Sequence, residues 1–287
     1  MKIINSLRDY FFQKEIIYIE DQTSFDLVLE DIQTEKMLAI DTEFIWRNTY
    51  FPKLSLVQVC TENRIYLLDC LSIDISKIKK ALSDHKIIKI FHSVRGDSSV
   101  LYNCLGIKLK NTFDTQLAED LLNDRKGDQI SLKKLVKKYF LKDISKSETN
   151  SDWENRPLRK KQLDYAAEDV RYLHTIMKIQ NNKLRNLNKI DSFNSLCINE
   201  IKLGEEDFSS SRLKRYRKKN RNVSEIEIKI FLWRESQAEK LNVPPSHIIE
   251  DRDLRKIKKI IEQKKINEFK WIIKKSSSRD EFVTCFL

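Results

Sequence analysis

The stretch LAIDTEF, residues 38–44, combines a strand-like apolar run with two acidic residues. It begins as a short apolar run of the kind that forms a buried strand, and it continues into two carboxylates, Asp41 and Glu43. Successive side chains of a strand point to opposite faces, so residues two apart share a face. We therefore expect Asp41 and Glu43 to project together from the C-terminal end of a strand.

The sequence around this stretch alternates between strand-like and helical patterns. Strand-like runs lie at 15–20, 37–41, 54–60, 64–70 and 86–91. The loop Thr61–Asn63 is short enough to join two of them as an antiparallel hairpin. Helical periodicity is expected at 22–34, 74–83, 97–104, 114–124, 131–139, 159–180 and 183–200. Strands that come first and helices that follow indicate an α/β fold with a mixed sheet covered by helices.

The composition predicts two domains. Of the 287 residues, 40% are hydrophobic and 34% charged, with only 4 Gly and 4 Pro. These values exclude collagen-like, flexible-linker and proline-rich proteins, and they favour long helices. The segment LGEEDFSSS (203–211) interrupts the helical pattern, so we expect one domain at 1–204 and a second at 205–287. Helical stretches at 224–241, 250–262 and 264–275 predict that the second domain is a small all-α domain.

The charge distribution points to a polyanionic partner. The net charge is +11, and residues 205–287 hold 21 Lys and Arg against 14 Asp and Glu, a surplus of +7. The densest part is RLKRYRKKNR (212–221), with seven basic residues in ten. Such a cluster is either a solvated helix face or a nucleic-acid contact, and the sequence leaves both open.

No targeting or membrane segment is expected. Charges interrupt the first residues where a signal peptide would have its apolar core, and no uncharged apolar run approaches the roughly 18 residues of a membrane span. The cysteines are scattered and form no C-x-x-C pair, which argues against a disulfide framework or zinc site. We expect a soluble cytoplasmic protein without a membrane partner. The five cysteines are Cys60, Cys70, Cys104, Cys197 and Cys285.

Two further carboxylates lie on apolar elements. Asp97 follows the strand at 86–91 and begins a helix, and Asp169 lies within a helix, one turn after Tyr165 on the same face. Each acid alone is explained as a cap or a solvated position. Together with Asp41 and Glu43, however, they would require a counter-charge if buried. Ligands that are all oxygen atoms favour Mg²⁺ or Mn²⁺.

The order of these motifs resembles a known family. DTEF (41–44), FHSVRGD (91–97) and YAAED (165–169) are similar to the three motifs of the DEDD 3′–5′ exonucleases, and within that family to bacterial ribonuclease D. The connecting segments FDTQLAEDLL (113–122) and SLKKLVKKYF (131–140) agree, so the resemblance covers about residues 15–200. The resemblance implies a ribonuclease H-like mixed-sheet exonuclease domain.

The second region resembles another module. FLWRESQAEKLNVPPSHIIEDRDLRKI (231–257) is similar to the helical domain shared by RecQ-type helicases and ribonuclease D, in a shortened form. This resemblance implies that residues 205–287 form a helical nucleic-acid-binding domain.

Carried over by position, the resemblance implies a set of catalytic residues. Asp41, Glu43, Asp97 and Asp169 would bind two divalent ions, Mg²⁺ or Mn²⁺, which clamp the scissile phosphate. Tyr165 would orient or help deprotonate the attacking water. By the same resemblance, Tyr165, four residues before Asp169, would place the chain in the tyrosine subclass. The histidine subclass would need His at position 164, where this chain has Asp164. Asp114 has the character of a helix N-cap rather than of a fifth ligand.

Substrate contacts are expected from residues near these motifs. Phe44 either stacks on a terminal base or packs in the core. His92 is structural or lies near the substrate, and Trp153 packs in the loop before Tyr165. The predicted substrate-binding residues are Thr42, Phe44, His92, Lys146 and Trp153.

The implied activity is that of a metal-dependent 3′–5′ exoribonuclease that releases nucleoside 5′-monophosphates. The resemblance implies tRNA precursors as RNA partners, with maturation of tRNA 3′ ends as the process, and no small-molecule cofactor. One alternative is a DNA 3′–5′ exonuclease, because the same site can cut either backbone and no residue for the 2′-hydroxyl can be located. Another is a non-catalytic RNA-binding module, against which the presence of all four carboxylates and Tyr165 argues.

Overall fold

The computed structural model describes residues 13–124, 129–145, 147–263, 265 and 268–286. The chain divides into two units. One comprises Met1–Ile45 and Lys53–Glu205, and the other comprises Trp46–Pro52 and Glu206–Leu287. Residues 46–52 were expected in the first domain, whereas in the structure they group with the C-terminal helices.

The first unit contains a six-stranded mixed sheet with the order β1-β4-β3-β2-β5-β6. β2 pairs antiparallel with β3, and β3 with β4, while the other neighbouring strands are parallel. The predicted mixed sheet and the hairpin of β3 and β4 are therefore confirmed. β6 is too short for its pattern to stand out in the sequence. The strands are β1 (Glu15–Ile19), β2 (Met37–Ile45), β3 (Lys53–Cys60), β4 (Arg64–Asp69), β5 (Ile88–Phe91) and β6 (Thr112–Asp114).

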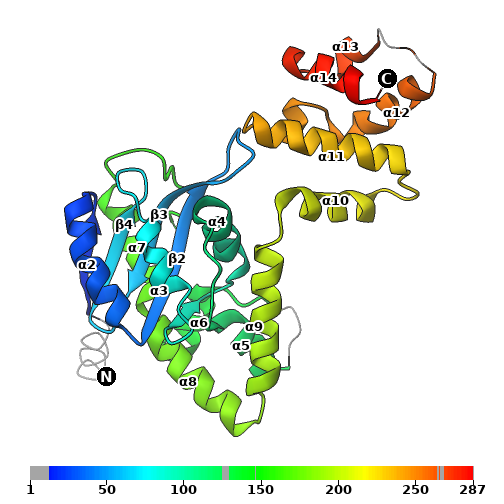
Figure 1. The fold of residues 1–287 in the computed structure, drawn as a ribbon. Coiled ribbons are helices and arrows are strands. Elements are labelled where there is room, and N and C mark those ends of the chain that lie inside the picture. The colour runs from blue at the N-terminus through cyan, green and yellow to red at the C-terminus, as the bar shows by residue number, and fades with distance from the viewer. Residues whose placement is uncertain (1–12, 125–128, 146, 264, 266–267, 287) are drawn as a thin grey trace. The chain divides into compact units, whose positions relative to one another are not determined.

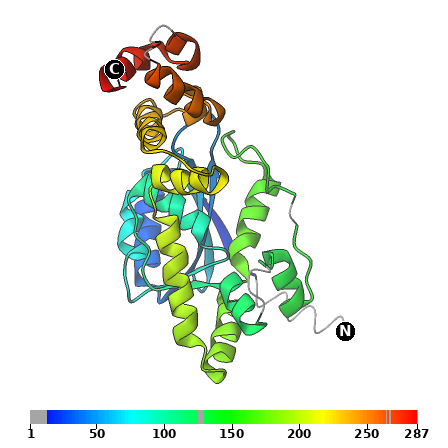
Figure 2. The same cartoon turned by 90° about the vertical axis from the view of Figure 1, so that its right-hand side faces the viewer.

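Helices cover both faces of this sheet (Figures 1 and 2). One face packs against α2 (Gln22–Thr34), the 3₁₀ turn Ser76–Ile78 with α3 (Lys79–Leu82), and α4 (Arg95–Leu105). The other face packs against α5 (Thr115–Leu122), α6 (Leu132–Phe140), α7 (Lys160–Arg171) and α8 (Leu173–Asn186). α9 (Ile190–Gly204) contacts both α4 and α5. Because both faces are covered, most strand residues are buried apolar side chains.

Two predicted helices have different bounds in the structure. The helix predicted at 159–180 is wrong as a single element, because α7 ends at Arg171 and α8 begins after Tyr172, whose ψ of −12° opens the helical turn. The helix predicted to begin at 183 also differs, because α8 continues to Asn186 and α9 begins at Ile190. The turn between them contains Asn188 at φ 54°, a left-handed conformation that Asn tolerates better than most residues.

The second unit is a bundle of helices with its own core. α11 begins with a capping box in which Ser224 and Glu227 each bond to the other's backbone amide. The helices are α10 (Phe208–Lys219), α11 (Glu225–Lys240), α12 (Leu254–Glu262), α13 (Phe269–Ile272) and α14 (Ser276–Phe286), with 3₁₀ turns at Pro245–His247 and Asp251–Asp253.

Residues 46–52 join this bundle through aromatic side chains. The guanidinium carbon of Arg212 lies 4.4 Å from the ring centroid of Tyr50 and 5.3 Å from that of Phe208. The Trp46 ring lies 4.8 Å from Phe208, and Arg212 also forms an ion pair with buried Glu235 at 2.9 Å. Arg212 is therefore an internal residue of the helical unit.

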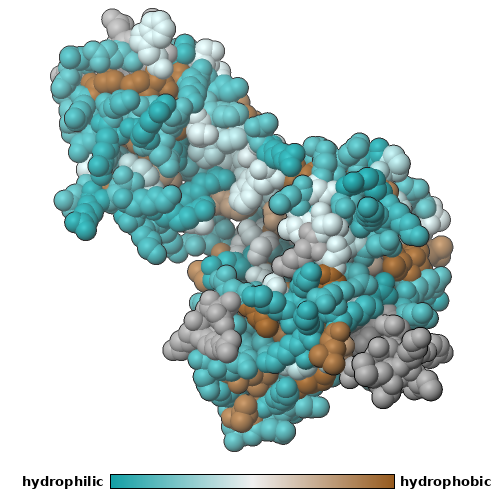
Figure 3. All heavy atoms as spheres, turned by 180° about the vertical axis from the view of Figure 1, so that it is seen from behind, coloured by the Kyte–Doolittle hydropathy of each residue, from teal (hydrophilic) through white to brown (hydrophobic). Residues whose placement is uncertain are grey.

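None of the helices in the described part of the chain combines the length and the apolar composition needed to cross a bilayer. On the face drawn in Figure 3, hydrophilic residues predominate and hydrophobic residues form small, separate patches.

Candidate active site

β2 carries the first two acids on the face that packs against α7 and α8. Ala39, two residues earlier on the same face, is buried in that core. Asp41 pairs with Gln58 of β3, and Glu43 pairs with Leu56. The register shifts directly after Glu43, at a bulge. Bulges redirect side chains and are frequent beside active sites.

α7 brings Tyr165 and Asp169 to the same place. The two residues are one helical turn apart and so lie on one face. Ala166 and Val170, the next residue after each of them, are fully buried and hold the helix against β2, β3 and β4. The small side chain of Ala166 allows α7 to approach the strands that carry the other acids.

Three carboxylates meet at this point. Oxygen atoms of Asp41, Glu43 and Asp169 all lie within 4.8 Å of one another. The fourth acid, Asp97 in the first turn of α4, accepts a hydrogen bond of 2.7 Å from the hydroxyl of Thr42 on β2. The charge of Asp97 raises the pKa of both Asp41 and Glu43. All four carboxylates therefore belong to one electrostatic cluster.

The electrostatics of this cluster suit a hard cation. Burial raises the pKa of Asp41 well above its usual range, and the charges of Asp97, Asp169 and Glu43 raise it further. Burial and the charges of Asp169 and Asp97 raise the pKa of Glu43 to about 9, and burial raises the pKa of Asp97 to about 7. The four groups can be ionised together only beside a positive counter-charge. Their oxygen atoms are the ligands that Mg²⁺ and Mn²⁺ prefer, so the residues fit the expected metal.

Asp97 is positioned through another buried acid, Asp114. As the N-cap of α5, Asp114 accepts hydrogen bonds from the backbone amides of Gln116 and Leu117, at 2.8 and 3.2 Å. It also accepts one of 2.8 Å from the amide of Val94, directly before α4. The predicted N-cap is confirmed, and the same carboxylate ties the start of α4 to the start of α5.

Tyr165 lies beside the cluster as a neutral phenol. Burial and the charge of Asp169 raise its pKa. Its hydroxyl is 3.3 Å from Oγ1 of Thr149, and its ring centroid is 6.1 Å from that of Trp153. Trp153 is 3% exposed, in line with the packing role expected for it.

A pocket of about 310 Å³ opens over the cluster, lined by Asp41, Tyr165 and Asp169. His92 also lines it, and the two ring nitrogens of His92 lie 2.9 Å from Oγ1 of Thr115 and 3.0 Å from the carbonyl oxygen of Ile130. His92 is thus both held by the protein and close to the site.

Several lining residues could not be foreseen. The polar side chains of Gln116, Lys133 and Thr149 reach the pocket from three different segments. Each lies in a stretch that resembles the family, but its own spacing does not distinguish it from a surface residue. Only the folded arrangement identifies these residues.

Two other predicted substrate-binding residues, Phe44 and Thr42, do not line the pocket over the acidic cluster in the part of the chain that the structure describes. Phe44 packs against the core on the face that α2 and α4 cover, which was one of its two expected roles. Contact of Phe44 with a base stays a prediction. Thr42 is buried and holds Asp97. Lys146 lies outside the described residues.

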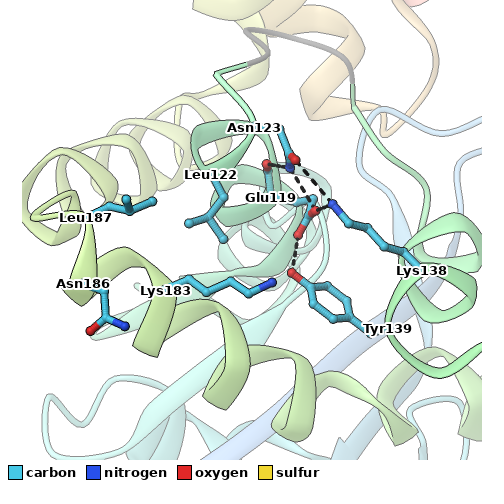
Figure 4. Close-up of a pocket in the computed structure, with 8 residues that line it drawn as sticks. All are labelled: Glu119, Leu122, Asn123, Lys138, Tyr139, Lys183, Asn186 and Leu187. Carbon is cyan, nitrogen blue, oxygen red and sulfur yellow. Dashed lines mark hydrogen bonds and ion pairs between the residues drawn. The ribbon is translucent and has the colours of Figure 1, made fainter.

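A second pocket, also of about 310 Å³, surrounds the buried carboxylate Glu119 (Figure 4). The phenol of Tyr139 donates to Glu119 at 2.7 Å, Gln180 donates at 2.9 Å, and Lys138 forms an ion pair with it. Burial alone would raise the pKa of Glu119, but the hydrogen bonds from Lys138, Gln180 and Tyr139 lower it to about 2. The charge of Glu119 is thus compensated by donors within the chain.

Comparison with known proteins agrees with this geometry. The model of a 3′–5′ exonuclease family matches residues 16–185. Ribonuclease D of Desulfotalea psychrophila is 34% identical over 77% of this chain and 60% of its own length, and that of Bartonella henselae is 32% identical over 83% and 60%. The chain thus spans about 60% of the length of these curated relatives.

A solved structure shows the same fold. That of Escherichia coli ribonuclease D aligns with a TM-score of 0.74 and 22% identity, and it covers 84% of this chain and 65% of the other. The predicted exonuclease fold and the resemblance to ribonuclease D are confirmed. The motif order and the family match, which covers more than half of the sequence, lead to one conclusion: the chain belongs to the 3′–5′ exonuclease family.

Proposed function

We propose that this protein is a metal-dependent 3′–5′ exoribonuclease of the ribonuclease D type, which releases nucleoside 5′-monophosphates from RNA. The observation that carries the proposal is the convergence of Asp41, Glu43 and Asp169 within 4.8 Å. Two elements far apart in the sequence supply these acids, and Tyr165 lies one turn from Asp169. A purely structural role would not explain this cluster, because the negative charges of these carboxylates repel and destabilise one another.

The proposed ligands of two Mg²⁺ or Mn²⁺ ions are Asp41, Glu43, Asp97 and Asp169. When bound, such ions activate a water and stabilise the leaving 3′ oxygen. The chain's own part is to hold the four carboxylates in place, with Thr42 and Asp114 fixing Asp97.

Tyr165 is proposed to orient the attacking water. Its phenol is neutral because burial and Asp169 raise its pKa, so the hydroxyl keeps its proton and can both donate and accept a hydrogen bond. Thr149, 3.3 Å away, restrains the direction of that hydroxyl. Positioning by one hydroxyl typically contributes about 10²-fold to the rate.

RNA is the proposed substrate class, and tRNA precursors are the proposed natural substrates. The curated relatives carry the name ribonuclease D, and the Escherichia coli protein is described as an exoribonuclease involved in structured RNA processing. We place the activity in the cytoplasm, because the named relatives are bacterial ribonucleases and cellular RNA is processed there.

The helical unit, residues 206–287 together with 46–52, is proposed to bind RNA. The basic cluster at 212–221 separates into two parts, because Arg212 is internal whereas Arg215, Arg217, Lys218 and Lys219 are exposed. Exposed cations of this kind contact phosphates.

A pocket of about 320 Å³ supports this binding role. Arg221, at the end of the cluster, lines it together with Arg255, Lys258 and Lys259 of α12. Arg255 donates to the carbonyl oxygen of Arg221 at 3.0 Å. Basic residues that follow α10 and that lie on α12 thus line one pocket, together with Glu262 and with Glu227, which pairs with Arg255.

A digest of labelled nucleic acid tests the proposal. The full-length chain is incubated with 5′-labelled RNA, or with DNA of the same sequence, in Mg²⁺, Mn²⁺ or EDTA. We expect RNA to shorten stepwise from its 3′ end only with a divalent ion, with release of nucleoside 5′-monophosphates. RNA with a blocked 3′ end should remain intact. Faster shortening of DNA would favour the DNA exonuclease, and binding without shortening would favour the non-catalytic module.

A further inference from the structure

Gln58 is a fully buried polar residue whose side chain finds no hydrogen-bond partner among the described residues. Its side chain has 0% exposure, and within the described residues neither Oε1 nor Nε2 has a partner. Buried amides are almost always hydrogen-bonded, because an unpaired one loses its contacts with water and gains none in return. Because an unpaired buried amide is unfavourable, we expect Gln58 to form a hydrogen bond in another state of the site.

The position of Gln58 indicates what that role is. On β3 it is directly paired with Asp41 of β2 and with Leu67 of β4. Directly paired side chains lie on the same face, with Cβ atoms roughly 4.5–5.5 Å apart. Its same-face neighbours along β3 are Leu56 and Cys60. Among these neighbours only Asp41 has a strong hydrogen-bonding group.

We infer that Gln58 is a positioning residue for Asp41. Its amide N–H donates to the Asp41 carboxylate when that carboxylate holds a cation, and it thereby fixes the direction in which Asp41 presents its ligand oxygen. This inference rests on the proposed metal-dependent function. Hydrogen bonds behind a metal ligand commonly change metal affinity by about 10- to 100-fold.

The test measures metal binding without RNA. The full-length chain, stripped of metal, is titrated with Mn²⁺ in a calorimeter, and Gln58→Met is compared with the unsubstituted protein. Met fills a similar volume but cannot donate. We expect the Kd for Mn²⁺ to rise by about 10-fold or more. The unfolding midpoint of the metal-free protein should stay the same or rise, because an unpaired buried amide has been removed.

Gln180 offers a matched control. It is also a fully buried glutamine, but its amide donates to the carbonyl oxygen of Thr115 and to Glu119, both at 2.9 Å. Gln180→Met should therefore lower the unfolding midpoint and leave the Kd for Mn²⁺ unchanged, which is the reverse of the pattern expected at Gln58.

The outcomes separate the two proposals. If the unsubstituted protein binds no Mn²⁺, the proposed function fails. If it binds Mn²⁺ and Gln58→Met binds equally well, only the role of Gln58 is overturned. Gln58→Leu serves as a second variant with the same expected loss of affinity. Failure of both variants to fold would assign Gln58 to the core and also overturn the inference.

Discussion

Buried carboxylates of this chain occur in two environments that differ in their donors. Burial would raise the pKa of Asp69, but hydrogen bonds from Arg156 and Tyr18 lower it, and Glu119 is similarly surrounded by donors. The pKa of Asp41 and that of Glu43 are instead raised by burial and by their acidic neighbours. Donors supplied by the chain mark a structural acid, whereas mutually repelling acids mark a site that needs an external cation.

Asp169→Asn should abolish hydrolysis and preserve the fold. The substitution removes a ligand charge, and it also relieves repulsion with Asp41 and Glu43, so the metal-free protein should be unchanged or more stable by about 1 kcal/mol. Nuclease assays at saturating Mg²⁺ and denaturant unfolding check both parts. Asp164→Asn is the control, because it makes the same change on an exposed position of α7. Full activity of Asp169→Asn would refute the assignment.

Tyr165→Phe should reduce the rate by about 10²-fold and leave metal binding intact, because only the hydroxyl that orients water is lost. Single-turnover cleavage of RNA measures the rate. In the control Tyr139→Phe, the lost hydroxyl belongs to the Glu119 network, so stability should fall while the rate is unchanged. Equal rates for Tyr165→Phe and the unsubstituted protein would leave Tyr165 a packing role only.

In EDTA, the free energy of unfolding should fall as the pH rises. Asp97 and Glu43 have folded pKa values raised to about 7 and about 9, so the folded state holds their protons more tightly than the unfolded state does. Their contribution is fully present below the unfolded values near 4 and is lost as the pH rises through the folded values. Denaturant unfolding at pH 5, 7 and 9 measures this loss, on the order of a few kcal/mol.

Saturating Mg²⁺ should flatten this pH dependence, because cations compete with protons for the same carboxylates. The comparison is made on the same protein with and without EDTA. A stability that does not depend on pH in EDTA would show that the four acids do not interact as the structure indicates.

The site acids and Tyr165 could be predicted from the sequence, because the regular spacing of side chains in a strand and in a helix aligns them in pairs. A spacing of two on a strand aligns Asp41 with Glu43, and a spacing of four on a helix aligns Tyr165 with Asp169. Gln58 and Thr149 could not be predicted in this way. Gln58 depends on the register between β2 and β3, and Thr149 depends on the path of an irregular segment.

Breaks between consecutive helices were harder to predict from the sequence than the helices themselves. The apolar pattern continues across Tyr172, because residues on both sides of it, such as Val170 and Leu173, are buried in the same core. Periodicity therefore predicts one helix where the backbone forms two. Conversely, α2 was predicted with the bounds that it has in the structure, because Asp21 caps it through the amide of Ser24 and the pattern ends at Thr34.

The contact of α9 with α4 depends on Gly204. A Cβ at this position would lie 1.8 Å from Oγ of Ser98 and 2.7 Å from the carbonyl oxygen of Arg95. Gly204→Ala should therefore lower the free energy of unfolding by about 1–3 kcal/mol, because one helix must move away from the other. Denaturant unfolding provides the measurement.

Gly96→Ala is the matched control for this prediction. A Cβ at Gly96, within α4, would meet nothing within 4 Å. The same substitution there should be neutral or stabilising by up to about 1 kcal/mol, since Ala favours the helix. Similar losses at both positions would show that close packing is not what Gly204 provides.

For the whole molecule, the basic surface of the helical unit predicts a salt effect. Replacing Arg215, Arg217, Lys218 and Lys219 by Gln should weaken RNA binding and reduce the slope of log affinity against log salt by roughly 0.7 for each lost phosphate contact. Cleavage of saturating RNA should change little, because all four carboxylates precede residue 170. Affinities at several salt concentrations decide the matter, and unchanged slopes would contradict the binding role.

Arg212→Gln is the informative contrast. Arg212 lies among aromatic rings and pairs with buried Glu235. This substitution should therefore destabilise the helical unit, but it should not reduce the slope of log affinity against log salt. These substitutions test the charge alone. Removing residues 205–287 would also remove the contact of Tyr50 and Phe51 with Phe208.

Residues 46–52 pack in one unit with the C-terminal helices but are synthesised long before them. The ribosome makes Tyr50 early, and its partner Phe208 follows roughly 160 residues later, which is about 8–30 s at ordinary elongation rates. Throughout that interval the nascent chain presents Trp46, Tyr50 and Phe51 without the helices that cover them. This short aromatic segment is therefore one part of the chain to which chaperones should bind during translation.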